Sequence, residues 1–307
     1  MKKQKKPPRL RRWLIGGLFM LIAVFMIGIL SFGYIKSRIV YIDRTTVYLD
    51  DLPDAFDGKN ILFVSDIDIV GVSSPGAAAS VFKKLEKLQP DILILGGDYA
   101  GYNLMNKLNS TGDEQTLSDN RREFFYALAG FNAPMGKYAV IGENDINASD
   151  IASEMALGQI TCISDTAGTL RIGDYSINLI GLADVSNKDA NCSEIARSYS
   201  SNDCVIVVTH NPSAISEIMT AEASDTGQWS DLILSGHTHH GQVVVGERQL
   251  IPLTQQEMRY SGGWSNEGGV YILVSPGLGC ETVNLRYGTT PQVHLITLRQ
   301  KQAFNFE

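Results

Sequence analysis

The stretch LILSGHTHHGQ, residues 232–242, places three histidines directly after a short apolar run. Such a run is typical of a buried strand, and the glycines let the backbone turn sharply beside a ligand. A single histidine is more often structural than functional. Here, however, four of the five histidines lie either in this stretch or in VVTHNP, residues 207–212, while His294 lies in an apolar run as a core or edge residue. We therefore interpret both stretches as parts of one metal site.

Three earlier apolar runs also end abruptly in polar residues. FVSDID (63–68), LILGGDY (93–99) and AVIGEND (139–145) supply Asp66, Asp68, Asp98, Glu143, Asn144 and Asp145. One such Asp alone is weak evidence, because many cap helices or form turns. Ligand sites in open α/β sheets gather at the carboxyl ends of strands, so we expect these side chains to meet the histidines. Carboxylates and imidazoles together suit Mn, Fe or Zn, and oxygen-rich sets admit Mg. Two such divalent ions can clamp a phosphate and activate a bridging water.

The hydrophobic pattern predicts an α/β protein. Apolar runs indicate strands at 59–65, 91–95 and 137–141, and helical spacing indicates helices at 76–88 and 119–128. Short strands follow from residue 160, then buried strands at 205–210 and 232–237, and antiparallel strands between 270 and 299. The polar stretch 103–120 is predicted to be a mobile loop. This order favours two mixed sheets with helices outside.

Residues 14–35 form a run of 22 residues without charge, long enough to cross a bilayer as a helix. Seven cations precede residue 13, which favours a cytoplasmic N-terminus and an exported remainder. We expect a basic cytoplasmic segment (1–13), a transmembrane helix (14–35), a linker and entry strand (36–58), the main domain (59–300) and a tail (301–307). A cleaved signal peptide and a twin-arginine export signal are the alternatives, and both also export the domain. The expected location is the cell membrane, in a single pass.

The charge of the chain limits the kinds of binding partner to expect, and its cysteines limit the kinds of site. The chain carries a net charge of −7, so without its seven N-terminal cations the rest carries −14. An acidic domain binds nucleic acid poorly, so we expect no nucleic-acid partner. The four cysteines form no CxxC pair and no zinc spacing. Free thiols are the first interpretation, and a disulfide stays open for an exported domain.

The order SDID, GGDY, GEND, THNP and GHTHHGQ resembles the calcineurin-like metallophosphoesterases, in particular the membrane-associated bacterial branch with one N-terminal anchor. The resemblance covers roughly residues 36–300, including the late PGLG and LRYGTTPQV segments. It implies a four-layer αββα sandwich, a two-metal centre, and hydrolysis of phosphomonoesters, phosphodiesters or pyrophosphates. It also implies that Asp66 and His239 bind the first metal, Asp98 bridges both, and His210 and His237 bind the second.

Three positions depart from that family's pattern. Asp68 stands where the family usually has His, and it can still bind a metal as a harder oxygen donor. Glu143 and Asn144 replace the family's Asn-His pair. Glu143 can ligate and adds a negative charge, but Asn144 cannot act as a general acid near neutral pH. The site should therefore prefer harder ions such as Mn or Mg. His240 stands where the branch usually has Gly, and either contacts the substrate or is simply an exposed turn residue.

Two functions follow as expectations. The first is a membrane-anchored, metal-dependent phosphoesterase, expected to be a monomer, acting on a phosphorylated small molecule or a lipid head group. Asn144 and His240 are its candidate catalytic residues. The second is a weakened or inactive family member that binds a metal, a phosphate ligand or a partner without turnover, motivated by Asn144. A purely structural domain would leave the histidine clustering unexplained.

Overall fold

The computed structural model describes residues 9–70, 73–102, 114–146, 148, 150–182, 192–246, 248–249, 253–281 and 283–301. Within these ranges the strands form two six-stranded sheets and a short hairpin. The first sheet has, in spatial order, β1 (Tyr41–Leu49), β14 (Gln292–Gln300), β2 (Asn60–Val64), β3 (Ile92–Leu95), β4 (Lys137–Ala139) and β5 (Thr161–Cys162). It is mixed, because β14 runs parallel to β1 and antiparallel to β2, while β2 to β5 are parallel.

The second sheet is mixed in the same way. Its order is β12 (Gly263–Glu267), β13 (Val270–Val274), β9 (Leu232–Ser235), β8 (Val205–Val208), β7 (Tyr175–Gly181) and β6 (Thr166–Ile172). The four central strands are parallel and the two edge strands antiparallel to their neighbours. The hairpin consists of β10 (Val244–Val245) and β11 (Arg248–Gln249).

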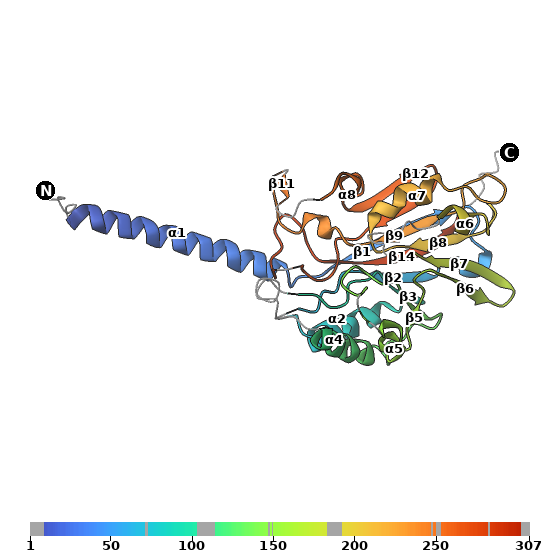
Figure 1. Cartoon of the computed structure of the whole chain (residues 1–307), viewed down its shortest axis with the longest axis horizontal. Coiled ribbons are helices and arrows are strands. Elements are labelled where there is room, and N and C mark those ends of the chain that lie inside the picture. Colours follow the sequence, from blue (N-terminus) through green and yellow to red (C-terminus); the bar gives the residue numbers. More distant parts are fainter. Residues whose placement is uncertain are drawn as a thin grey trace.

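Side-chain alternation along the strands produces a four-layer sandwich. On β2, Ile61 and Phe63 face the core between the sheets, whereas Leu62 and Val64 face an outer helical layer. That layer contains α2 (Pro75–Leu85), α4 (Glu114–Ala127) and α5 (Ile151–Ala156). On the opposite outer face lie α6 (Cys192–Ala196) and α7 (Ile215–Thr220), with α8 (Gln255–Arg259) beside them, as Figure 1 shows. The expected αββα architecture is therefore confirmed.

Helix α1 (Arg9–Lys36) projects away from the sandwich (Figure 1). Its stretch Trp13–Lys36 is long and apolar enough to cross a membrane by length and composition, and none of its most apolar part is buried in the protein. Among its described side chains, those of the last turns contact the domain. The backbone N–H of Arg286 donates to the carbonyl of Gly33 at 3.1 Å, and the rings of Phe32 and Tyr287 meet edge to face.

Several expectations about single elements need correction. The predicted loop 103–120 is wrong for its last part, because α4 begins at Glu114, and residues 103–113 lie outside the described residues. The late strands β13 and β14 each have an antiparallel neighbour, as expected, but each also has one parallel partner and they belong to different sheets. The cause is that parallel strand pairs leave no short-range signal such as a hairpin turn. The four cysteines are free, which decides the disulfide question.

Candidate metal centre

The site lies where the two sheets meet at their carboxyl ends. Asp66 follows β2 in the first sheet, and His237 follows β9 in the second. The backbone N–H of His237 donates to both carboxylate oxygens of Asp66, at 2.9 and 3.1 Å. The two sheets are therefore joined by a hydrogen bond within the predicted ligand set itself.

The backbone at this seam is held in an unusual conformation. Positive φ occurs at eleven described residues other than glycine, and six of them are predicted site residues: Asp66, Asp68, Asp98, His237, His239 and His240. Each such residue costs on the order of 1–3 kcal/mol and persists only where the surroundings impose it. Glycines make this packing possible. A Cβ at Gly97, whose φ is +96°, would lie 2.6 Å from Nδ1 of His210.

One group of ligand atoms gathers around Asp68. Nε2 of His239 lies 3.3 Å from Oδ2 of Asp68 and 3.7 Å from Oδ1 of Asp66. All three side chains are almost fully buried. The structure thus brings together the two residues that the family resemblance assigns to the first metal, together with Asp68 in place of the family's His.

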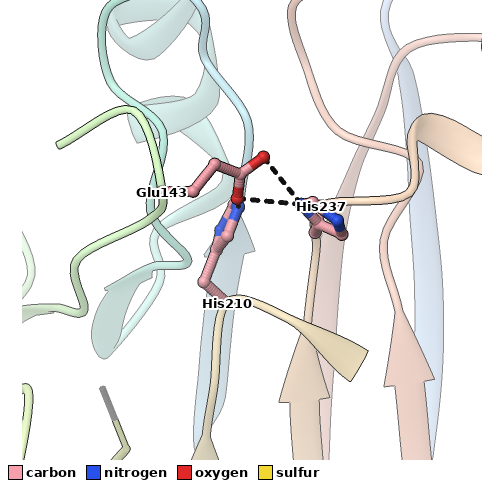
Figure 2. Close-up of side chains that lie close together, drawn as sticks. All are labelled: Glu143, His210 and His237. Atoms are coloured by element: carbon pink, nitrogen blue, oxygen red, sulfur yellow. Dashed lines mark hydrogen bonds and ion pairs between the residues drawn. The ribbon is translucent and has the colours of Figure 1, made fainter. Parts of the chain in front are cut away.

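A second group gathers around Glu143, between two imidazoles (Figure 2). Oε2 of Glu143 lies 2.8 Å from Nε2 of His210, and both carboxylate oxygens lie 2.8 Å from Nδ1 of His237. His210 also faces the first group, with Nε2 3.5 Å from Oδ2 of Asp98 and 3.9 Å from Oδ1 of Asp66. Asp66, Asp98 and His210 form one possible metal-holding set, and Glu143, His210 and His237 form another.

Asn144 lies against Asp98. Its backbone N–H donates to Oδ1 of Asp98 at 3.0 Å, and its side-chain amide donates to Oδ2 at 2.7 Å. Behind them, the buried carboxylate of Asp145 accepts from the backbone N–H groups of Asp98, Tyr99 and Gly142. Asn144 therefore orients a predicted metal ligand and lines the small cavity next to Asp68.

The unpartnered polar atoms of the site fit bound cations. Both carboxylate oxygens of Asp68 and Nε2 of His210 are buried and make no hydrogen bond of adequate geometry. A buried carboxylate without a donor is costly, and a cation supplies the missing partner. The donor set of carboxylates and imidazoles is one that divalent metals use. The residues present therefore fit a divalent metal centre.

In the metal-free site, burial and ion pairing shift the pKa values of the carboxyl and imidazole groups. Burial raises the pKa of Asp66 to about 6, and burial together with Asp98 and Asp66 raises the pKa of Asp68 well above its usual range. Burial opposes the charged forms of Glu143 and His237, but their pairing prevails, so the pKa of Glu143 is lowered and that of His237 rises to about 9. Binding a metal at His237 must therefore displace a proton.

Two residues that contact the site, Glu257 and Arg286, were not among the site residues predicted from the sequence. Glu257 on α8 places Oε1 3.0 Å from Nε2 of His237. Arg286 is fully buried and donates to the carbonyl of His239 at 2.9 Å, while its Nη2 lies 3.1 Å from Nδ1 of the same histidine. Arg286 lies in the LRYGTTPQV segment that the resemblance covers, and Glu257 completes a T-x-x-E capping signature that predicts only a helix start.

His240 is placed differently from its neighbours. It is exposed, and its ring lies beside Gly262, where an added Cβ would be 2.7 Å from Nδ1. Its backbone N–H donates to Oγ1 of Thr238. Within the described part of the chain it belongs to neither possible metal-holding set.

Comparison with known proteins agrees with this geometry. The family model described as calcineurin-like phosphoesterase matches residues 59–241, which include every predicted ligand. The chain belongs to this family. The uncharacterized metallophosphoesterase YkuE of Bacillus subtilis (strain 168) is 24% identical over 300 residues, covering 94% of this chain and 97% of that protein. The phosphodiesterase YaeI of Escherichia coli (strain K12) is 26% identical over 251 residues, covering 78% and 81%.

A vertebrate relative is also similar. The zebrafish (Danio rerio) transmembrane protein with metallophosphoesterase domain is 19% identical over 269 residues, covering 82% of this chain and 56% of that protein. The calcineurin-like phosphoesterases are metal-dependent phosphoester hydrolases that use divalent ions, and this chain has Asp and His groups able to hold such ions.

Proposed function

We propose that the protein is a membrane-anchored hydrolase of phosphomonoester, phosphodiester or pyrophosphate bonds with two divalent ions, Mn, Fe, Zn or Mg. Asp66, Asp68, Asp98, Glu143, His210, His237 and His239 would hold them. The observation that carries the proposal is that Asp68 and Nε2 of His210 are buried without a hydrogen bond of adequate geometry, beside two possible metal-holding sets that share His210. Bound there, the ions would lower the pKa of a water molecule and stabilise the charge on the reacting phosphate. Four carboxylates in the set favour the harder ions Mn and Mg.

The protein's own groups prepare this centre. Asn144 holds both oxygens of Asp98, which keeps that carboxylate aimed between the two ligand groups. Because the amide of Asn144 has no titratable proton near neutral pH, it can stabilise charge by hydrogen bonding but cannot protonate a leaving group. His240, exposed on the loop that carries His237 and His239, is the candidate substrate contact.

Activity is tested on the full chain in detergent, stripped with a chelator and reloaded with each ion separately. We expect hydrolysis of at least one of a phosphomonoester, a phosphodiester and a pyrophosphate, highest with Mn or Mg. Protein that binds no metal would overturn the proposal. Protein that binds metal but hydrolyses none of the substrates would favour the second candidate function.

That second candidate is a family member that binds metal and a phosphate ligand with little or no turnover. The observation that favours it is the hydrogen bonding of Asn144 to Asp98, which leaves the position of the family's acid without an imidazole. Loss of such proton transfer costs about 10²–10⁴-fold in rate. In Asn144→His, a rise in kcat of at least tenfold would favour a weakened enzyme. A fall in kcat from an active wild type would favour a mechanism rebuilt around Asn144.

The contacts of α1 support membrane anchoring and a substrate near the membrane. Arg286 joins two partners: its backbone N–H binds the carbonyl of Gly33 on α1, and its guanidinium binds the carbonyl of His239. A cavity of about 80 Å³ at this junction is lined by Ser37 and Arg38 after α1, and by Ile67 next to Asp68. A single residue therefore separates the end of the apolar helix from the metal-binding loop.

We infer that α1 crosses the cell membrane once with its basic N-terminus in the cytoplasm, and that the substrate is a phosphorylated lipid head group rather than a freely soluble phosphoester. The full chain in liposomes should then hydrolyse phospholipid head groups in its own bilayer with a higher kcat/KM than bis(p-nitrophenyl) phosphate in solution. Equal or lower efficiency on the lipid would refute the lipid assignment. Digestion of the domain by external protease in spheroplasts tests the topology, and protection would refute it.

A further inference from the structure

Glu257 is a buried carboxylate that contacts the metal centre from outside the predicted ligand set. It lies on α8, and its side chain is 11% exposed. Its Oε1 lies 3.0 Å from Nε2 of His237. The other ring nitrogen, Nδ1, faces Glu143 on the opposite side of the ring. His237 is therefore held between a carboxylate inside the cluster and one outside it.

The carboxylate of Glu257 is fixed by its own helix. Thr254 caps α8: its Oγ1 accepts the backbone N–H of Glu257 at 3.2 Å, and its backbone N–H donates to Oε2 of Glu257 at 2.6 Å. With Oε2 bound to the helix start, Oε1 points at the imidazole. This reciprocal capping arrangement gives the carboxylate a defined position instead of a flexible one.

We propose that Glu257 is a positioning residue that accepts the Nε2–H of His237 and thereby presents Nδ1 to the metal. The proposal rests on the proposed metal centre. A neutral imidazole carries one N–H, so a hydrogen bond at one nitrogen determines which nitrogen is free to bind a metal. A carboxylate partner also raises the basicity of the ring, and losing such a partner typically costs about 10–100-fold in metal affinity.

His210 provides an internal comparison. Its Nδ1 lies 2.7 Å from the carbonyl of Gly96, which leaves Nε2 facing the cluster, 2.8 Å from Oε2 of Glu143. The two histidines therefore present opposite nitrogens, Nε2 from His210 and Nδ1 from His237. The partner of His210 is a neutral carbonyl, whereas that of His237 is a carboxylate. The basicity effect should therefore be specific to the ion bound by His237.

The test is a titration of chelator-stripped full chain in detergent with Mn²⁺, following free Mn²⁺ by electron paramagnetic resonance. Wild type should bind two ions. Glu257→Gln should weaken one of the two by about 10–100-fold and leave the other within threefold. The matched control is Glu267→Gln. Glu267 accepts hydrogen bonds from Arg259 and Tyr260 at the end of the same helix, and not from His237, so this variant should bind as wild type does.

The outcomes separate the two proposals. If Glu257→Gln binds both ions as tightly as wild type, the role of Glu257 is overturned while the metal centre stands. If wild type binds neither Mn²⁺ nor, in parallel titrations, Zn²⁺, Fe²⁺ or Mg²⁺, the metal centre falls and the role of Glu257 with it. Equal melting temperatures in chelator show that the variant is folded. Should it fail to fold, Glu257→Asp, which keeps the charge but withdraws it by one methylene, carries the same expectation.

Discussion

Replacing Asp68 with Asn should stabilise the metal-free protein and weaken the metal-loaded one. Asp68 is buried, and neither of its oxygens accepts a hydrogen bond of adequate geometry. Burial, Asp98 and Asp66 raise its pKa well above the ordinary value of 3.8. The raised pKa means that this carboxyl opposes folding of the metal-free protein at neutral pH. Each unit by which a folded-state pKa exceeds the unfolded-state value corresponds to about 1.4 kcal/mol of lost stability above both values.

The variant avoids most of this cost. An asparagine amide in the same place is neutral, but it leaves its own donors unpaired, which costs about 1–3 kcal/mol. Because the pKa of Asp68 is raised well above its usual range, we expect the gain to exceed this cost, by on the order of 1 kcal/mol in the free energy of unfolding of the metal-free protein. A domain of this size gains roughly 2–4 °C in melting temperature for each kcal/mol. We expect the metal-free melting temperature to rise by about 2–4 °C.

Bound metal should reverse the sign of the stability difference between Asp68→Asn and wild type. Ions that bind only the folded state stabilise it according to their concentration and Kd, by about 2.7 kcal/mol at a hundredfold excess over Kd. Asn is a neutral and weaker ligand than a carboxylate, so Asp68→Asn should raise the Kd for Mn²⁺ by tenfold or more. In excess Mn²⁺ the variant should then gain less from the metal than wild type does.

The pH dependence gives an independent check. The folded-state pKa of Asp68 lies above the unfolded-state value, so the native protein binds more protons in the interval between them. Unfolding free energy therefore falls as pH rises through that interval. Metal-free wild type should lose stability relative to Asp68→Asn between about pH 4 and the raised pKa, and the two should converge at lower pH.

The assay is intrinsic tryptophan fluorescence during heating of the full chain in detergent, with chelator and with excess Mn²⁺. Asp231→Asn is the control. Burial raises the pKa of Asp231 to about 7, but Asp231 lies at the opposite end of β9 from His237. This variant should change stability equally with and without metal. The reasoning is refuted if Asp68→Asn shifts the melting temperature equally in both conditions, because that marks a structural carboxylate and not a ligand.

Two further substitutions probe the frame of the site. Gly97→Ala places a methyl group 2.6 Å from Nδ1 of His210 and should weaken Mn²⁺ binding at least tenfold in the Mn²⁺ titration. Gly173 also has a positive φ, but a methyl group there meets open space, so Gly173→Ala should leave Mn²⁺ binding unchanged. Equal effects of the two variants would contradict the steric explanation. Arg121→Met removes the partner of buried Glu154, whose Oε2 lies 2.6 Å from Nε of the arginine, and should lower the urea-derived free energy of unfolding by about 3–5 kcal/mol. Adding Glu154→Gln should restore most of that loss, and a double variant as unstable as the single one would contradict the ion-pair explanation.

The sequence was sufficient for the elements whose signal is local. Short apolar runs predicted β2, β3, β8 and β9 because strands buried on both faces are apolar throughout. The polar residues directly after these strands could be expected at one edge, because parallel strands end on the same side. The start of α4 was missed, since the sequence EQTLSDN is polar and buries only part of its surface. The sheet assignment of β13 and β14 was also missed, because strand pairing across the chain leaves no local pattern.

The candidate site likewise has a part that the sequence predicts and a part that it does not. Its proposed ligands follow strands and could be read from motif order. The partners that orient them could not, since Glu257 on the short helix α8 and Arg286 in an irregular segment are brought to His237 and His239 only in the folded chain. The hydrogen bond from the side-chain amide of Asn144 to Asp98 could not be predicted either, because the residue type does not determine which acceptor an amide binds.

The position of the site at the seam between the sheets has a consequence for folding. Without metal, burial of the acidic side chains contributed by the first sheet, together with their mutual repulsion, raises the pKa values of Asp66 and Asp68. The second sheet contributes imidazoles to the same seam, and two of them, His210 and His237, pair with Glu143 (Figure 2). Bound cations would replace proton uptake and histidine charge as the means of neutralising this seam. Metal binding and the packing of one sheet on the other are then linked, so a residue that orients a ligand also contributes to holding the two halves of the sandwich together.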